Sequence, residues 1–214
     1  MSCELEVRIR AADPSSNSWV VLAEASSEIY EPRVIDGVFS RAVILGRLQG
    51  RVDSVRENVE FQVRVLTGGG MRACLNLQSV TVGRVAAISG ALNLDPKVLE
   101  SSDANQEEMD RDVSPLHRPE LVVKLIGDSP VTGKEMVLWI TESEWFEPGE
   151  VEERVREVLS LGMSAVHGDA RAWALQVSIS LASDRGVRPA FVLSRDVIAA
   201  MAAYGASLDF DPYV

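Results

Sequence analysis

The sequence predicts an α+β fold made of two tandem copies of one β-β-α-β-α-β unit. Each copy is expected to be a two-layer sandwich, with helices on one face of a mostly antiparallel sheet. Three observations predict this: an internal repeat, alternating apolar residues typical of strands, and segments with helical periodicity in each copy. The chain has 214 residues and is 46% apolar, which is enough for two small cores.

The repeat is found by laying residues 1–98 over residues 117–214 without a gap. About a fifth of the positions are then identical, roughly three times the number expected by chance for an ordinary composition. Leu5 falls on Leu121, and Asp95-Pro96 falls on Asp211-Pro212. We therefore expect a first repeat over residues 1–98, an acidic linker over 99–118 and a second repeat over 119–214.

The strands are predicted by residues that alternate between apolar and polar. Leu5, Val7 and Ile9 alternate with charged residues, which is the period of a half-buried strand. The same pattern predicts further strands at 19–26, 59–65 and 92–95 in the first copy, and at 121–125, 136–142, 175–181 and 207–211 in the second. A short extended piece is expected before the second helix of each copy.

The helices are predicted by apolar stripes. Val151, Val155 and Val158 form one stripe opposite charged residues, so a helix is expected there and over the equivalent residues 34–45. Second helices are expected at 81–89 and 195–204, the latter with Ser194 as its N-cap. Glycines stand near all four predicted ends, and we expect them to close the helices: Gly46 and Gly162 for the first helix of each copy, Gly90 and Gly205 for the second.

Charge and hydropathy exclude several classes of protein. The net charge of −11 argues against a nucleic-acid partner, which requires a basic surface. The acidity lies in the linker and the second repeat, because the first 98 residues are neutral. No apolar run is long enough to span a membrane, and the first residues lack the apolar stretch of a signal peptide. We expect a cytoplasmic protein whose two cysteines are reduced.

No motif with catalytic, metal-binding or cofactor-binding chemistry is found. The two histidines, His117 and His167, have no metal-ligand spacing with either cysteine. The stretch 127–135 resembles a phosphate-binding loop only superficially, since it has five residues between its glycines and Glu135 after the lysine. We therefore expect no cofactor, no metal and no catalytic residue.

Paired glutamates precede the first helix of each copy, Glu28 with Glu31 and Glu144 with Glu147. The simpler interpretation is that these carboxylates favour the positive end of that helix. The alternative is a divalent-cation or acid–base role in a hydrolase.

A run of glutamates in the second copy is the one feature that suggests a function. Seven glutamates lie between residues 142 and 157, and the equivalent stretch of the first copy is far less acidic. Such runs are commonly solvated helix faces, but one tryptophan lies within this run and another just before it, and tryptophans often anchor interfaces when they are not part of a core. The predicted partner-binding residues are Trp139, Glu142, Glu144, Trp145, Glu147, Glu150, Glu152 and Glu153.

The end of the second copy resembles a known family. The segment FVLSRDVIAAMAAYGASLDFDPYV is similar to the end of the uncharacterised bacterial family known as domain of unknown function 4279. The likeness is carried by Leu193, Ser194 and the run from Gly205 to Asp211. In that family a helix usually follows the first strand, whereas here only a turn is expected. Because the family has no established activity, the resemblance implies no catalytic residues.

Two functions of different classes fit these observations. The first is a non-enzymatic acidic binding protein that occupies a basic protein partner, for example an immunity protein that covers a toxin. The second is a structural or assembly subunit of a phage or bacterial particle, which would self-associate. The cation-dependent hydrolase is the weaker third alternative.

Overall fold

A computed structural model describes residues 4–13, 16, 18–28, 32–49, 59–67, 74–98, 121–144, 146–166, 168–182 and 190–213. The first repeat forms β1 (Glu4–Asp13), β2 (Ser18–Ser27), α1 (Pro32–Leu48), β3 (Val59–Thr67), β4 (Leu75–Leu77), α2 (Ser79–Ala87) and β5 (Gly90–Val98). The second repeat forms β6 (Leu121–Asp128), β7 (Glu135–Ser143), α3 (Pro148–Gly162), β8 (Ala174–Ala182), β9 (Phe191–Leu193), α4 (Arg195–Tyr204) and β10 (Ser207–Tyr213). Two short 3-10 turns, Met163–Ala165 and Ala170–Ala172, lie between α3 and β8. The predicted α+β class is confirmed.

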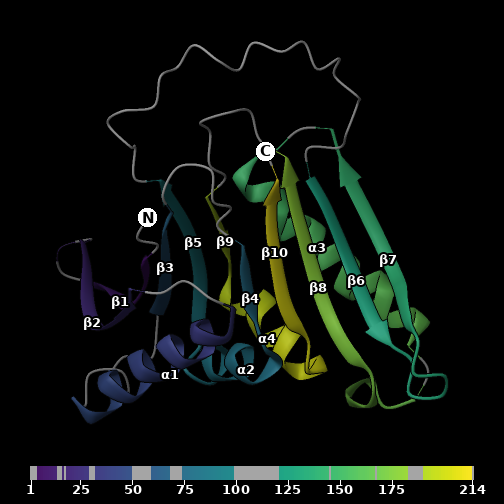
Figure 1. The fold of residues 1–214 in the computed structure, drawn as a ribbon, viewed down its shortest axis with the longest axis horizontal. Helices are drawn as coiled ribbons and strands as arrows, with labels where there is room; N and C mark the ends of the chain where they lie inside the picture. Colours follow the sequence, from purple (N-terminus) through teal and green to yellow (C-terminus); the bar gives the residue numbers. More distant parts are fainter. Residues whose placement is uncertain are drawn as a thin grey trace.

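The strands form two five-stranded sheets, and each sheet takes one strand from the other repeat. The first sheet has the order β2-β1-β3-β5-β9, and the second has the order β4-β10-β8-β6-β7. Leu193 of β9 lies opposite Leu92 of β5, and Leu77 of β4 lies opposite Leu208 of β10. These two pairings join equivalent positions, so the exchange of β4 and β9 is reciprocal (Figure 1).

The exchanged strands bring apolar side chains into the partner half. Leu75 and Leu77 of β4 are buried, and α1 packs against β4 as well as against β1 and β2. In the same way α3 packs against β9 as well as β6 and β7. Phe191 of β9 meets Phe210 of β10 edge to face, with ring centroids 5.1 Å apart, which links the two sheets. The two repeats therefore form one interlocked body.

The rest of the core follows the predicted alternation. In the first repeat Leu5, Val7 and Ile9 are buried under α1, and Phe39 of α1 stacks on Phe61 of β3 with centroids 5.8 Å apart. Helices α2 and α4 pack against each other where the repeats meet. No helix in the described ranges combines the length and apolar character needed to cross a bilayer.

Two predicted glycine roles are wrong for a steric reason. Gly162 is helical, with φ −65°, and does not cap α3; a Cβ atom placed there would lie 2.6 Å from Leu125 Cδ2. Gly46, its equivalent, lies inside α1, which runs on to Leu48. Glycine is therefore needed at residue 162 because the helix approaches the sheet closely.

Of the second pair of glycines, one closes its helix and the other does not. Gly205 does cap α4, with φ +70°, as predicted. Gly90 instead begins β5, where a Cβ atom would lie 2.8 Å from the ring of Phe61. The residue equivalent to Gly205 is Ser89, which has φ +52° and is the one non-glycine residue with positive φ in the described part of the chain.

Candidate functional site

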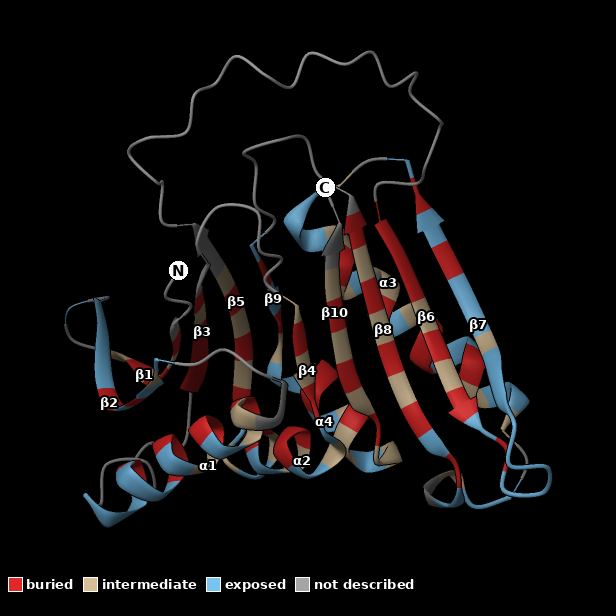
Figure 2. Ribbon diagram, viewed as in Figure 1, coloured by how far each residue is buried: buried red, intermediate tan, exposed pale blue. Residues whose placement is uncertain are grey.

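The two outermost strands, β2 and β7, are equivalent in the repeat and lie at opposite ends of the molecule (Figure 1). Among the strands that the structure describes, each pairs with a neighbour on one side only. Both expose apolar side chains, namely Trp19, Val20 and Val21 on β2 and Met136, Val137, Trp139 and Ile140 on β7. Figure 2 shows β7 largely exposed beside the largely buried β6 and β8. Free backbone groups and apolar side chains together make such a strand a template for pairing with another chain.

The apolar side chains of β7 lie on both of its faces. Val137 and Ile140 lie opposite Ile126 and Lys124 on the face away from the helices, and their exposures are 54% and 45%. Trp139 lies opposite the buried Leu125, beside Gly162 at the end of α3, and is 39% exposed. Trp139 is therefore a surface residue that rests on the edge of the core.

Three exposed acidic residues lie at or just beyond the end of β7. Glu142 lies on the strand, Glu144 follows it and Glu147 is the N-cap residue of α3; all three are exposed. Within the described residues, none of these three carboxylates takes part in a hydrogen bond or ion pair. We call β7 together with Glu144 and Glu147 the acidic edge.

Glu150 is engaged inside the molecule. Arg154 donates to Glu150 at 3.0 Å and to Glu157 at 3.1 Å, and also to the hydroxyl of Thr141 on β7. These contacts tie α3 to the edge strand. The hydrogen bond from Arg154 to Glu150 is the main cause that raises the pKa of this guanidinium, against a smaller effect of burial.

Glu152 is also engaged, but on the other flank of α3. Its carboxylate accepts hydrogen bonds from the backbone amide of Ser194, from the Ser194 hydroxyl and from Arg156. Burial alone would raise the pKa of Glu152, but these hydrogen bonds outweigh it and hold the pKa below its ordinary value. Ser194 is the N-cap residue of α4, as predicted, yet Glu152 supplies the capping contact.

The first repeat keeps this contact with other residues. Asp36, equivalent to Glu152, accepts a hydrogen bond from Thr81 at the start of α2. A carboxylate of the first helix thus ties down the start of the second helix in both repeats. Glu152 is therefore a structural residue, and this role was missed because the sequence alone shows only an acidic run.

Glu153 lies away from β7. It lines an open groove of about 800 Å³ between α3 and the exchanged strand β9, together with Arg156, Val192 and Asn93. Trp145 lies outside the described residues. The structure therefore brings Trp139, Glu142, Glu144 and Glu147 to the end of the molecule at β7, and it separates Glu152 and Glu153 from them.

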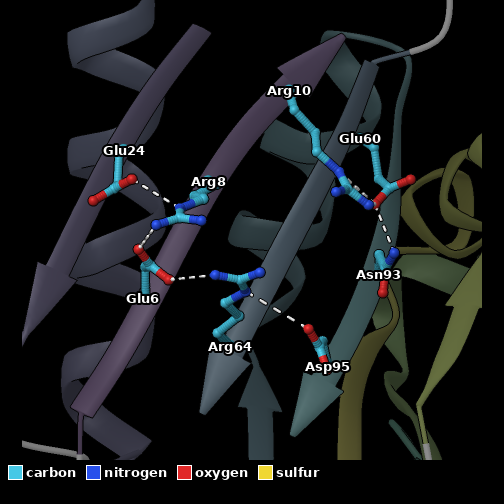
Figure 3. Close-up of polar contacts among 8 residues, drawn as sticks. All are labelled: Glu6, Arg8, Arg10, Glu24, Glu60, Arg64, Asn93 and Asp95. Carbon is cyan, nitrogen blue, oxygen red and sulfur yellow. Dashed lines mark hydrogen bonds and ion pairs between the residues drawn. The ribbon is translucent and has the colours of Figure 1, made fainter. Parts of the chain in front are cut away.

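The equivalent end at β2 is balanced in charge. Arg8 donates to Glu24 at 2.8 Å, and Arg10 lies over the ring of Trp19, 4.7 Å from its centroid. Glu60 accepts hydrogen bonds from Arg10 and Asn93. Figure 3 shows a ladder of two rows across the sheet: one runs from Glu24 through Arg8, Glu6 and Arg64 to Asp95, and the other joins Arg10, Glu60 and Asn93. The equivalent positions of the second repeat hold mainly apolar, hydroxyl and amide residues, so this ladder of charge pairs is not repeated there. The end at β2 therefore carries paired charges, whereas the end at β7 carries exposed carboxylates.

Two polar contacts occur where β4 and the residue before it meet β10. Asn76 donates to Asp209 and Cys74 donates to Asp211, both at 3.2 Å. Burial raises the pKa of Asp209, the charge of Asp211 adds to this, and the hydrogen bond from Asn76 opposes it. Among the residues that the structure describes, no three His, Cys, Asp or Glu side chains are placed to hold a metal ion.

Comparison with known proteins adds no relative from which a site could be transferred. No family model, no curated protein and no solved structure matches this chain.

Proposed function

We propose that this chain is a non-enzymatic cytoplasmic binding protein that recognises a basic protein partner along the acidic edge. The partner adds an extended, positively charged segment to the free side of β7. Backbone hydrogen bonds supply the affinity, and the exposed side chains of β7 supply the specificity.

The observation that supports this most is the coincidence of three properties on one strand. Within the described part of the chain, strand β7 is unpaired on one side, it exposes Val137, Trp139 and Ile140, and carboxylates without partners stand at its end. A strand with these properties favours a partner that is extended, apolar on alternate residues and basic on the others. The proposal includes membership of the family named above, which is supported by the segment from Leu193 to Asp211.

A synthetic eight-residue peptide of alternating valine and lysine is a suitable probe. Titration into the labelled protein, followed by amide shifts in NMR, should move resonances of β7 before those of β2. Glu142→Lys/Glu144→Lys should weaken binding roughly tenfold, because both carboxylates are exposed beside the strand. Binding to the unaltered protein should also weaken as salt is added.

The matched control changes the net charge equally at other places. Glu28→Lys/Asp196→Lys alters two exposed carboxylates away from β7 and should leave the affinity nearly unchanged. Equal losses in both double variants would mean that the peptide responds to the total charge alone, and the proposal would be wrong.

A further inference from the structure

We infer that the groove between α1 and α2 is a second binding site, which takes an amphipathic helix with acidic flanks from another protein. The groove lies on the first repeat, whereas the acidic edge lies at the far end of the second, so the inference goes beyond the proposed function. It follows from the shape of the groove, from two exposed apolar residues, from one glycine and from the charge of the lining.

The groove is formed where α1 and α2 lie side by side (Figure 1). It is open to solvent and has a volume of about 360 Å³. Val80, Gly83, Arg84 and Ala87 line it from α2, at the spacing of residues on one helix face. The lining residues of α1, which begin at Ser40 and end at Arg47, have the same spacing. Two such stripes, each about two turns long, form the kind of groove that accepts a third helix.

Two apolar side chains of the lining are exposed at positions where the fold accepts polar residues. Ile44 is 56% exposed and Val80 is 61% exposed. Their equivalents in the second repeat are Ser160 and Asp196, which also lie in helices. The fold therefore does not explain the apolar residues at these two positions, but a partner that covers the groove does.

Gly83 shows the same contrast between the repeats. It lies in the middle of α2, where glycine is less favourable than alanine, and a Cβ atom at this position would meet nothing of the surrounding structure within 4 Å. The equivalent residue of the second repeat is Ala199. The surrounding structure therefore does not require a glycine here, but a docked helix can approach α2 most closely where a side chain is missing.

The charge of the lining indicates acidic flanks on the partner helix. Arg47 and Arg84 give the described lining a formal charge of +2, because none of its residues is acidic. Arg47 already interacts within the chain. Arg84 donates to the hydroxyl of Ser40 through one nitrogen, and none of the described residues pairs with its other two. A carboxylate of a docked helix can therefore pair with Arg84.

The nearby carboxylates do not cancel this charge. Asp36 is the only carboxylate among the described side chains of α1 and α2, and it is engaged with the start of α2. Glu28 precedes α1 and stands more than two turns before Ser40, while Glu24 is paired with Arg8. A second copy of this chain is a poor occupant, since two facing grooves would bring only arginines together.

A synthetic peptide of about fifteen residues is the probe, with leucines on one helical stripe, glutamates on both flanks and alanines elsewhere. Titrated into the labelled protein, it should shift the amide resonances of the groove before those of β7. Gly83→Leu should weaken binding roughly tenfold, because the new side chain fills the groove, without lowering the melting temperature. The matched control is Gly37→Leu, at an exposed glycine of α1 with equally open space that does not line the groove. It should leave the affinity nearly unchanged.

Two further variants test the apolar contact and the charge with residues that the second repeat already carries. Ile44→Ser/Val80→Asp should weaken binding roughly tenfold. Arg84→Ala should weaken binding of the glutamate peptide roughly threefold and make it less sensitive to salt. Arg195→Ala, which changes the net charge equally at an exposed position of α4, should have no such effect.

Equal losses for Gly83→Leu and Gly37→Leu, or shifts in the groove no larger than those at β7, would overturn the inference. Tighter binding of a peptide with lysine in place of glutamate would do the same, because the arginines would then not select the partner. Self-association that Gly83→Leu abolishes, measured by sedimentation velocity, would show that a second copy occupies the groove instead. The valine–lysine peptide tests the acidic edge separately, so either proposal can fail while the other stands.

Discussion

Glu152 Oε2 accepts a hydrogen bond of 2.9 Å from the backbone amide of Ser194, and Glu152 Oε1 accepts one from the Ser194 hydroxyl at the same distance. These contacts join the second turn of α3 to the start of α4, where the helix leaves amide groups without partners of its own. In the first repeat Asp36 accepts a hydrogen bond of 3.4 Å from the backbone amide of Gln78, the residue equivalent to Ser194, and another from the Thr81 hydroxyl. The contact with the backbone amide is thus preserved although the side chains at both positions differ.

We predict that Glu152→Ala lowers the free energy of unfolding by about 1–2 kcal/mol, because the start of α4 loses its capping carboxylate. Glu153→Ala is the control, since Glu153 is exposed and has no partner within the described residues. Urea denaturation of both variants at neutral pH measures the difference. Equal stabilities would show that the contact with Ser194 contributes nothing.

The free energy of unfolding that Glu152→Ala loses should depend on pH. The pKa of Glu152 is lowered in the fold, so its contribution is complete above the ordinary carboxyl pKa and is lost as the pH falls through the lower, folded pKa. The stability difference between the unaltered protein and Glu152→Ala should therefore shrink in acid. A difference that is constant from neutral to strongly acidic pH would contradict the assignment.

The pKa of Asp209 is shifted in the opposite direction to that of Glu152. Burial, together with the charge of Asp211, raises its pKa in the fold, so ionisation of Asp209 reduces stability as the pH rises from the unfolded pKa through the folded one. Asp209→Asn should stabilise the protein at neutral pH by on the order of 0.5 kcal/mol. The equivalent residue is Asn93, so an amide already occupies this position in the first repeat. Thermal melts at acidic and neutral pH would test this, and a variant less stable than the unaltered protein at neutral pH would refute it.

The charged ladder of the first sheet allows a direct comparison of a buried and an exposed carboxylate. Glu60 is 7% exposed and accepts from Arg10 and Asn93, so Glu60→Ala leaves two donors without their acceptor. We expect a loss of about 3 kcal/mol. Glu24→Ala removes the exposed pair with Arg8 and should cost less than about 1 kcal/mol. Denaturant titrations that rank the two variants in the reverse order would contradict the burial of Glu60.

The class and order of elements could be predicted because each repeat carries a local signal. Leu5, Val7 and Ile9 alternate as a strand does, and Val151, Val155 and Val158 recur as a helix does. The pattern of α1 is more apolar than that of α3 and does not by itself predict a helix clearly. The equivalent residues of α3 do, so the repeat supports the prediction of α1. Such signals depend on neighbouring residues only.

Strand order and the division of the glutamates could not be predicted in this way. The exchange of β4 and β9 depends on which sheet edge each short strand reaches. Strands β5 and β10, the two possible neighbours, both carry alternating apolar residues, so the sequence pattern does not distinguish them. The acidic run was interpreted as one surface, although helical spacing places Glu150 and Glu157 on one flank of α3 and Glu152 on another. Helical spacing was therefore the signal in the sequence that could have separated the glutamates within α3 from Glu142, Glu144 and Glu147, which precede the helix.

Strands β2 and β7 are the ends of the molecule because each repeat completes the other's sheet. Cysteine cross-linking measures this directly, in a chain with Cys3 and Cys74 replaced by serine and a protease site inserted between residues 99 and 118. Asn93 lies opposite Val192 across β5 and β9, so Asn93→Cys/Val192→Cys should form a disulfide that holds the two halves together after cleavage until it is reduced. If the strands were not exchanged, β4 would pair with β5 and Asn76 would lie opposite Asn93. Efficient cross-linking of Asn76→Cys/Asn93→Cys, with separation of the cleaved halves of Asn93→Cys/Val192→Cys without reductant, would contradict the account.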